Sequence, residues 1–589
     1  MRHISSTRIG QVQEVLGAQV TAELDPELAG ISPVHEGEIR TIGQVGSLVL
    51  IPQGMVDLVA MVESVGLSEL SPSDRMPIPF VAAGRRWLRL QVIGEVDRGT
   101  RQFTRGIANY PALGDQVHLS STDDISALFP RSGELRIEIG HLSTAKSVPV
   151  TLDVGKLVLR HSAVVGSTGS GKTSVVAALL QRFSNADWPG ANVIVIDSHG
   201  EYRNTLDEGM SVRSVLGRDQ EALPVPFWAL PATEILRVFS GVTASATTQK
   251  SFANIVEDER REFLAQCDWL DLPRAAVTAD TPVPFDLNRA WLRLDSENRE
   301  TRTDKGDPRT ACVISVGDSS TLTPTEYEPN GPGSTPPHQA TTYGTHGSVP
   351  AALRLGLLDP RLGFMRSTGA ETKQDTLAEA IRAWVGGSSP VSVLDFSGVA
   401  NHVAELAISV VLKLLFETAT RSRPSEDSVG RSRPVLVVIE EAHRYLGNDS
   451  LEAAKDAVNR IAREGRKYGI GLMLVTQRPS ELPDTTLSQC GTLIALRLSN
   501  STDQGRIRQA LPDEMRSTTD ALSSLRVGEA IVSGEASSFP ARVILNTPAP
   551  WPRAEDPDIS SWRSENSFPD VELALERWRG IYNEEKRKE

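Results

Sequence analysis

The 589-residue chain contains few cysteines, and their positions exclude two kinds of site. Cys267, Cys312 and Cys490 lie far apart, and no CxxC pair occurs. A disulfide framework needs several cysteines at short spacings, and a structural zinc site needs paired ligands. The sequence therefore predicts neither and favours a reducing compartment. It also shows no residue cluster typical of a nuclease metal site, so any cleavage activity is expected from a partner.

The chain also lacks a long hydrophobic run. Residues 1–17 contain no apolar core of a signal peptide. The most apolar stretch, 404–419, is interrupted by Glu405 and Lys413 and is shorter than the roughly 20 residues that span a bilayer. We therefore expect a cytoplasmic protein without a membrane partner, and we interpret 404–419 as a core helix.

Basic residues are outnumbered by acidic ones, giving a net charge of -14 and a pI of about 5.4. This balance argues against a basic coat protein, but an acidic total is compatible with a basic pore inside a ring. The 39% of hydrophobic and 23% of charged residues are typical of a globular protein. The length predicts about two to four domains.

The residue pattern changes near position 140. Residues 1–140 contain short β runs separated by Gly, Pro and Asp, which predicts a small β-barrel. Further along, apolar runs alternate with helical segments, which is typical of a parallel sheet covered by helices. The predicted buried strands are 162–166, 191–197, 391–396, 434–440, 471–477 and 491–498. The sequence therefore predicts an α/β core after an amino-terminal barrel.

A long segment interrupts this core after its second predicted strand. We expect 206–385 to form a mainly helical insertion, in which Pro, Gly, Ser and Thr make 318–349 a flexible loop. The core is thereby divided into 141–205 and 386–541. Residues 542–589 are predicted to form a Pro-rich arm and a helix, which packs on a neighbouring subunit or on its own subunit.

A glycine-rich loop follows the first predicted strand of the core. It matches GxxxxGK[ST] and leads into a helical segment. Glycines let backbone N–H groups surround phosphate oxygens, Lys172 neutralises their charge, and the Thr173 hydroxyl can ligate magnesium. The alternative is a glycine-rich turn without a ligand, but the flanking strand and helix favour a site for ATP and Mg²⁺. Its predicted residues are Gly166, Ser167, Thr168, Gly169, Ser170, Gly171, Lys172 and Thr173.

Two glutamates end a later apolar strand in the segment PVLVVIEEAHRYL. The carboxyl ends of the strands are where ligands bind in open α/β sheets. Glu440 is predicted to hold magnesium through water, and Glu441 is predicted to polarise the attacking water as general base. The alternative is a pair of solvated carboxylates.

The next helix and strand supply three further candidates. Gln477 ends GLMLVTQ and is predicted to sense the γ-phosphate or to position water, the alternative being a capping amide. Arg463 and Arg466 lie in a basic helical segment. They are predicted to act on a neighbouring subunit's nucleotide as arginine fingers, the alternative being a solvated helix face.

Two residues have open assignments. Arg160 lies at the start of the strand that precedes the glycine-rich loop, where it is either a phosphate contact or an ordinary surface residue. Asp197 ends the second predicted strand, in the segment IDSHGEY. It either lies behind the magnesium or shapes the turn together with Glu201.

Several segments together resemble the HerA family, within the FtsK–HerA group of P-loop motors. They are GSTGSGKT, DSHGEY, VLVVIEEAHRYL, REGRKYGIGLMLVTQRPSEL and IALRLSNSTDQ. The barrel is similar to the family's HAS-barrel, and the terminal arm to the segment with which HerA subunits brace one another. The resemblance implies a RecA-like P-loop core of the ASCE type. The resemblance implies the roles given above for Lys172, Thr173, Glu440, Glu441 and Gln477, for Arg463 or Arg466, and for Arg160.

Two features depart from the family pattern. Glu440 stands where many P-loop motors have Asp, so its longer side chain alters the contact with magnesium-bound water. The 206–385 insertion matches no core feature of the family and is a candidate for partner choice. Arginine outnumbers lysine, which favours a bacterial member.

The resemblance implies a homohexameric ring that hydrolyses ATP and moves double-stranded DNA through its pore, as a translocase or helicase. It also implies an effector partner, either a NurA-like nuclease in DNA end processing and repair or a nuclease or sirtuin-like NADase in antiphage defence. An alternative from another class is a nucleotide-gated hexameric scaffold that activates the effector without translocation. A membrane-bound ring ATPase is disfavoured because no membrane segment is evident, and a small-molecule kinase because Glu441 has no purpose there.

Overall fold

The computed structural model describes residues 7–552 with gaps, together with a few residues beyond 552. The gaps are 27, 29–33, 36–37, 40–43, 69–84, 130–134, 186, 207, 216–220, 366–375, 386, 388, 426–427, 448–449 and 512–516, and the residues described beyond 552 are 562–563, 571–572 and 575. The predicted terminal helix therefore lies outside the described residues. The chain divides into two units, one within 1–212, 385–395 and 416–552, the other within 213–384, 396–415 and 553–589.

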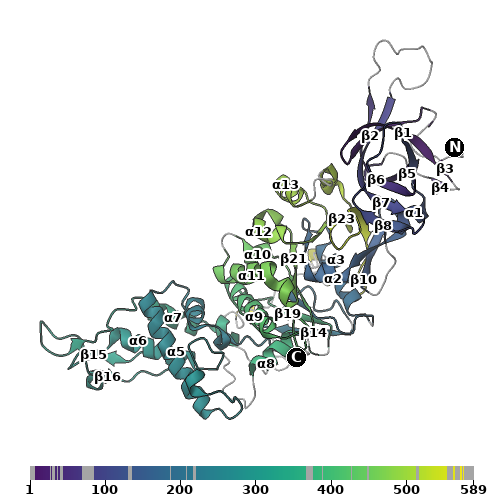
Figure 1. Ribbon diagram of the computed structural model, residues 1–589. Helices are drawn as coiled ribbons and strands as arrows, with labels where there is room; N and C mark the ends of the chain where they lie inside the picture. The colour runs from purple at the N-terminus through teal and green to yellow at the C-terminus, as the bar shows by residue number, and fades with distance from the viewer. Residues whose placement is uncertain are drawn as a thin grey trace. The chain divides into compact units, whose positions relative to one another are not determined.

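The first unit begins with a closed antiparallel barrel (Figure 1). Its strands are β1 Arg8–Leu16, β2 Gln19–Leu24, β5 Leu48–Gln53, β6 Val56–Ser68, β7 Arg85–Asp97 and β9 Gln116–Leu119. They follow the order β2, β1, β9, β5, β6, β7, and β7 pairs again with β2. Alternate side chains fill the interior, among them Val20, Leu58 and Leu90, each at most 1% exposed. The predicted small barrel is confirmed.

Shorter elements border the barrel. Strand β8 Phe103–Arg105 continues the sheet beyond β7, and β3 Val34–His35 pairs with β4 Glu38–Ile39. Helix α1 Thr122–Leu128 begins at Ser121, whose hydroxyl accepts the Asp124 N–H, while the Asp124 carboxylate accepts the Ser121 N–H. This reciprocal cap fixes where the helix begins.

An eleven-stranded sheet follows, and six adjacent strands of it are parallel. They are β12 Ser162–Val165, β13 Val193–Asp197, β19 Val391–Asp395, β20 Val435–Ile439, β21 Ile470–Thr476 and β22 Thr492–Ala495. Every residue of these strands is buried, as expected when helices cover both faces of a parallel sheet. Each predicted strand of the core is present, which confirms the α/β fold class.

The strand order brings the predicted motifs to one edge of the sheet. The order is β22, β12, β21, β20, β13, β19, so one strand, β21, separates β12 from β20. Val165 pairs with both Thr476 and Ala495, and Ile439 pairs with Ile196. Because the strands are parallel and in register, the loops that follow β12, β13, β20 and β21 leave from the same edge.

Antiparallel strands extend this sheet on the side of β22. They are β23 Glu529–Gly534, β24 Ala541–Leu545, β10 Arg136–Leu142 and β11 Ala145–Asp153, in that order. At the opposite edge, β14 Met210–Ser214 lies beside β19. Because β10 begins at Arg136, the sheet uses residues on both sides of the predicted boundary at 140.

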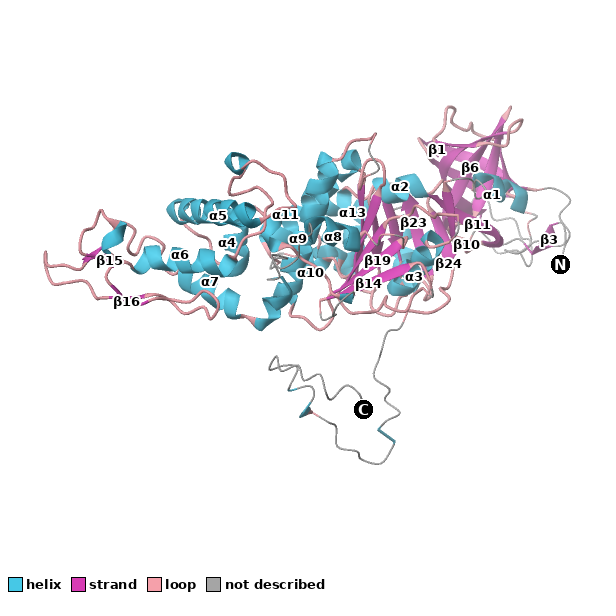
Figure 2. Ribbon diagram, turned by 90° about the horizontal axis from the view of Figure 1, so that it is seen from below, coloured by secondary structure: helices cyan, strands magenta, loops and turns pink. Residues whose placement is uncertain are grey.

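Helices pack against the sheet, and Figure 2 shows them in cyan beside its magenta strands. Those in contact with its strands include α2 Val154–Leu159, α3 Lys172–Phe183 and α11 Glu452–Tyr468. The short helices α10 His443–Leu446 and α12 Asp484–Ser488 contact α11, and α13 Ser501–Ala510 follows β22. Helix α9 Asn401–Arg421 contains the apolar stretch 404–419 and is buried along most of its length, which confirms the predicted core helix. Within the described residues, no helix is long and apolar enough to cross a membrane.

His161 lies directly before β12 and is a buried, neutral hydrogen-bond acceptor. Its Nδ1 accepts the Leu472 N–H at 3.0 Å, and its φ of 54° is in the left-handed region. Burial, only partly offset by a hydrogen bond to the Ala462 backbone, lowers the pKa of His161 to about 4 from 6.5. The fold therefore requires the uncharged imidazole.

The lowered pKa of His161 predicts that the stability of the fold decreases in acid, and that His161→Asn removes this decrease. The unfolded chain takes up a proton below about pH 6.5 and the folded chain only near pH 4, so stability is lost as the pH falls through this window. The loss reaches about 3 kcal/mol. Asparagine tolerates positive φ, offers an acceptor oxygen and does not titrate. Thermal unfolding midpoints from pH 7 to pH 4 should fall more steeply for the wild type; parallel curves would contradict the prediction.

The second unit is built around helices and a buried aromatic core. The helices are α4 Ala232–Ser240, α5 Ala246–Gln266, α6 Leu287–Arg299, α7 Val349–Leu358 and α8 Thr376–Trp384. Trp228, Phe252 and Trp291 are at most 1% exposed. Buried Arg260 donates to the carbonyl oxygens of Trp228 and Leu230 at 2.6 and 3.0 Å, so its charge is solvated by backbone. The boundaries assigned to the insertion stay a prediction.

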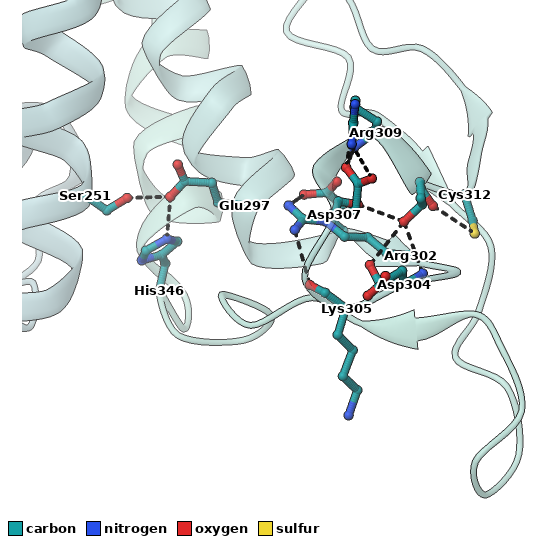
Figure 3. A network of polar contacts seen from close by, with 11 residues as sticks. Ser251, Glu297, Arg302, Asp304, Lys305, Asp307, Arg309, Cys312 and His346 are labelled. Carbon is teal, nitrogen blue, oxygen red and sulfur yellow. Dashed lines mark hydrogen bonds and ion pairs between the residues drawn. The ribbon is translucent and has the colours of Figure 1, made fainter.

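The segment between α6 and α7 is organised by short ladders and polar contacts. β15 Thr301–Arg302 pairs with β18 His338–Gln339, and β16 Val313–Ser315 pairs with β17 Glu326–Tyr327. In Figure 3, Ser251 and His346 both reach the Glu297 carboxylate, His346 at 3.2 Å. These contacts join the end of the segment to α5 and α6. The flexibility expected for 318–349 stays a prediction.

Candidate functional site

The loop between β12 and α3 has a conformation that requires glycine at three positions. A Cβ on Gly166 would lie 2.5 Å from Ser170 Oγ, closer than any real contact. Gly169 and Gly171 have φ values of 71° and 103°, which side chains disfavour. Gly171 is also the N-cap of α3, so the positive end of the helix faces the loop.

Buried polar groups line this loop, and they fit an anionic ligand. Lys172 is 8% exposed, and its Nζ donates to the Ser167 carbonyl at 3.3 Å. Burial lowers the pKa of Lys172, although the charges of Glu441, Glu440 and Glu201 oppose this effect. Among the described residues, the buried Ser170 hydroxyl has no hydrogen-bond partner. A cation, a helix amino terminus and an unsatisfied hydroxyl together suit phosphate.

Thr173 lies in the first turn of α3 and contacts a carboxylate from another strand. Its hydroxyl donates to Glu201 Oε2 at 2.7 Å. Glu201 follows β13 in the turn of the segment DSHGEY. A hydroxyl beside a carboxylate is an oxygen-rich setting of the kind that Mg²⁺ prefers.

Glu440 directly follows β20 and is 3% exposed. The Tyr202 hydroxyl donates to Glu440 Oε2 at 3.0 Å. Burial, and after it the charges of Glu441 and Glu201, raise the pKa of Glu440 to about 8. A nearby cation stabilises the ionised form of such a buried carboxyl group. The residues at this position therefore fit a magnesium ion as well.

Glu441 is the next residue and has a φ of 49°, which turns its side chain away from the course of β20. His443 Nδ1 lies 3.2 Å from Glu441 Oε2 and 3.1 Å from Thr476 Oγ1. Burial raises the pKa of Glu441, but the interaction with His443 and the charge of Lys172 outweigh it and leave the pKa below its ordinary value. Glu441 is therefore an ionised carboxylate, as a general base requires.

Gln477 follows β21 and touches the P-loop directly. Thr168 Oγ1 donates to Gln477 Oε1. Ser167 Oγ also lies 3.3 Å from Ser499 Oγ, beyond the end of β22. The predicted residues of the P-loop, Glu440, Glu441 and Gln477 therefore meet at one edge of the sheet.

The three predicted arginines lie elsewhere in the first unit. Arg463 and Arg466 are exposed on α11, and within the described residues neither side chain has a hydrogen-bond or ion-pair partner. Arg160 is the C-cap of α2 and forms an ion pair with Glu535. Because Arg160 precedes β12 and α11 leads into β21, these arginines lie toward the edge where the parallel strands begin. The structure does not bring them to the P-loop of the same chain.

Asp197 has the contacts of a residue that shapes a turn. Its carboxylate accepts the N–H groups of His199, Gly200 and Tyr202 at 3.1, 2.8 and 3.0 Å. Sequence reasoning considered Glu201 only as a residue that shapes the turn, and it left Tyr202, His443 and Thr476 without a role. Glu201 and Tyr202 lie in the motif DSHGEY, which could have marked them as site residues, whereas nothing in the sequence marks the contact between His443 and Thr476.

Comparison with known proteins identifies two matching family models. The model described as Helicase HerA, central domain, matches residues 137–415, and the model described as Helicase HerA-like C-terminal matches 372–550. The chain is similar to the DNA double-strand break repair helicase HerA of Pyrococcus furiosus, at 25% identity over 73% of this chain and 72% of the relative. It is also 25% identical to the protein of that name from Saccharolobus solfataricus, over 77% of each chain.

Solved structures of other proteins also align with this chain. VirB4 of Thermoanaerobacter pseudethanolicus aligns with a TM-score of 0.44 and 15% identity, over 71% of this chain and 97% of that chain. The plasmid coupling protein TrwB in complex with ADP and Mg²⁺ aligns with a TM-score of 0.42 and 14% identity, over 73% of this chain and 92% of that chain.

Proposed function

The chain belongs to the HerA helicase family and is an ATP-hydrolysing P-loop enzyme, and from this premise we propose that it is an ATP-driven motor on double-stranded DNA. The observation that carries the proposal is the convergence of Lys172, Glu441 and Gln477 at the carboxyl edge of one parallel sheet. DNA as the track is supported by the name of two relatives, DNA double-strand break repair helicase HerA.

The proposed chemistry assigns one task to each residue at this edge. Bound magnesium would neutralise charge on the phosphates, with Thr173 and Glu440 as the residues that would hold it. Lys172 and the P-loop N–H groups bind phosphate oxygens, and Gln477 orients the attacking water. Glu441 accepts the proton of that water, since its carboxylate stays ionised near neutral pH. This division of tasks favours hydrolysis over transfer to a second substrate.

We further propose that the chain works as a homohexameric ring. Exposed Arg463 and Arg466, together with Arg160, lie away from the P-loop of their own chain. If one of these three arginines acts on a nucleotide, that nucleotide belongs to a neighbouring subunit, which requires an assembly. A native mass measurement with ATP tests the ring, and a stable monomer would contradict it. The proposed effector partner is a nuclease or NADase, in DNA repair or antiphage defence.

Addition of duplex DNA is expected to raise the rate of ATP hydrolysis by the purified protein several-fold, because a motor couples its ATPase cycle to its track. Lys172→Ala should abolish hydrolysis with or without DNA, since it removes the cation at the phosphates. Lys146→Ala is the matched control, because Lys146 is an exposed lysine of β11. The measurement is phosphate release at fixed low salt.

Two outcomes of this assay have different meanings. Hydrolysis that duplex DNA neither stimulates nor requires, with no DNA binding, would contradict the motor. If the protein then activated an effector in a nucleotide-dependent way without displacing a roadblock from DNA, the nucleotide-gated scaffold would be the correct function.

A further inference from the structure

Two neighbouring residues of one turn reach both residues proposed for magnesium. Glu201 accepts the hydroxyl of Thr173 at 2.7 Å, and Tyr202 donates to Glu440 at 3.0 Å. The turn follows β13, whereas Thr173 follows β12 and Glu440 follows β20. A third strand of the sheet therefore supplies contacts to each half of the proposed metal site.

The backbone of this turn is fixed without help from the Glu201 side chain. Asp197 is fully buried and accepts three N–H groups of the turn, from His199, Gly200 and Tyr202. Gly200 has a φ of 75°, which lets the chain reverse direction there. The Glu201 carboxylate is thus not needed to hold the turn, and within the described residues its hydrogen bond is the one that Thr173 donates.

The chemistry of a hydroxyl explains what this contact does. A threonine hydroxyl offers one hydrogen to donate and two lone pairs to accept or to ligate a cation. Glu201 takes up the hydrogen, so the lone pairs of Thr173 point away from the carboxylate. Glu440 receives its hydrogen bond from Tyr202 and is not the acceptor for Thr173.

We propose that Glu201 is a positioning residue that orients the Thr173 hydroxyl toward magnesium. The proposal rests on the nucleotide site assigned above to Lys172 and Thr173. Removal of a partner that orients a metal ligand typically lowers metal affinity about 10-fold to 100-fold. Glu201 also places negative charge near Lys172, where it opposes phosphate binding in the absence of a metal. Loss of the Glu201 carboxylate should therefore weaken nucleotide binding in the presence of Mg²⁺ but not in its absence, and this difference makes the proposal testable.

The experiment measures the affinity of the full-length protein for a fluorescent, non-hydrolysable ATP analogue, once with Mg²⁺ and once with EDTA. For the wild type, Mg²⁺ should tighten binding. Glu201→Ala should bind the analogue equally well or better in EDTA. The factor by which Mg²⁺ increases its affinity for the analogue should be about tenfold smaller than for the wild type. Glu201→Gln keeps an acceptor oxygen and should show an intermediate loss. Glu208→Gln, at an exposed carboxylate nearby, is the control and should match the wild type.

A double variant separates positioning from a general structural effect. If Glu201 acts through Thr173, then Thr173→Ala combined with Glu201→Ala should lose no more Mg²⁺ dependence than Thr173→Ala alone. Full Mg²⁺ dependence in folded Glu201→Ala, or additive losses in the double variant, would overturn the inference. If Glu201→Ala fails to fold, Glu201→Gln carries the test. Absence of Mg²⁺-dependent binding in the wild type would instead overturn the proposed nucleotide site.

Discussion

Glu441→Gln is expected to slow ATP hydrolysis by about a hundredfold to ten-thousandfold, the range typical for loss of a general base. The amide has the same size as the carboxylate and the same backbone requirement at a φ of 49°, so the fold should be unaffected. It cannot accept a proton from water. Nucleotide affinity should stay equal or rise, because one negative charge near Lys172 is removed.

The measurement pairs steady-state phosphate release with binding of a fluorescent ATP analogue. Glu452→Gln is the control, because Glu452 is an exposed glutamate at the start of α11. It should leave both quantities unchanged. A Glu441→Gln protein that hydrolyses ATP within a few-fold of the wild-type rate would remove Glu441 from the mechanism. Loss of binding together with hydrolysis would assign it a structural role instead.

A second large loss of ATP hydrolysis is expected when the exposed arginines of α11 are replaced. Arginine fingers contribute about a thousandfold or more to turnover in P-loop enzymes. We therefore expect Arg463→Ala or Arg466→Ala to reduce hydrolysis by such a factor. Lys467→Ala is the matched control, since Lys467 is another exposed cation on the same helix. Arg460 is unsuitable, because it pairs with Glu417 at 2.6 Å and its loss would alter packing.

A mixing experiment shows whether the arginine acts on a neighbouring subunit. Lys172→Ala protein has no working P-loop but keeps its arginines, whereas the arginine variant has the opposite defect. Rings assembled from both contain intact P-loops next to intact arginines. Measurable hydrolysis should therefore return on mixing two inactive proteins. No recovery in rings that contain both subunits would show that the residue does not act in trans.

The sequence predicts most of the catalytic edge because its signals are local. A P-loop, an apolar strand ending in two glutamates and a strand ending in Gln477 are each readable within about ten residues. That Thr168 contacts Gln477, some three hundred positions away, follows from β21 lying beside β12. Strand order depends on long-range packing, which no local pattern encodes.

Other contacts could not be predicted for the same reason. Glu201 belongs to a recognisable motif, but its partner Thr173 is known only once β13 and β12 are placed in one sheet. Arg160 is twelve residues from Lys172 in sequence, yet β12 lies between them and directs Arg160 toward Glu535. Proximity in sequence was therefore a poor guide to proximity in the fold. The barrel was predictable because short alternating strands are themselves a local signal.

The pairing of β10 with β24 has a consequence for how the chain reaches its native state. Asn546 contacts Glu138 across a separation of 408 residues, and β10 has β24 as its neighbour on one side. During synthesis, β10 leaves the ribosome long before β24 exists. The first unit therefore cannot complete its sheet until nearly all of its residues have been translated. Contacts between residues so far apart in the sequence are also slow to form. A nascent chain stopped before residue 541 lacks β24, so the edge of β10 that pairs with β24 has no partner, and unpaired strand edges promote aggregation.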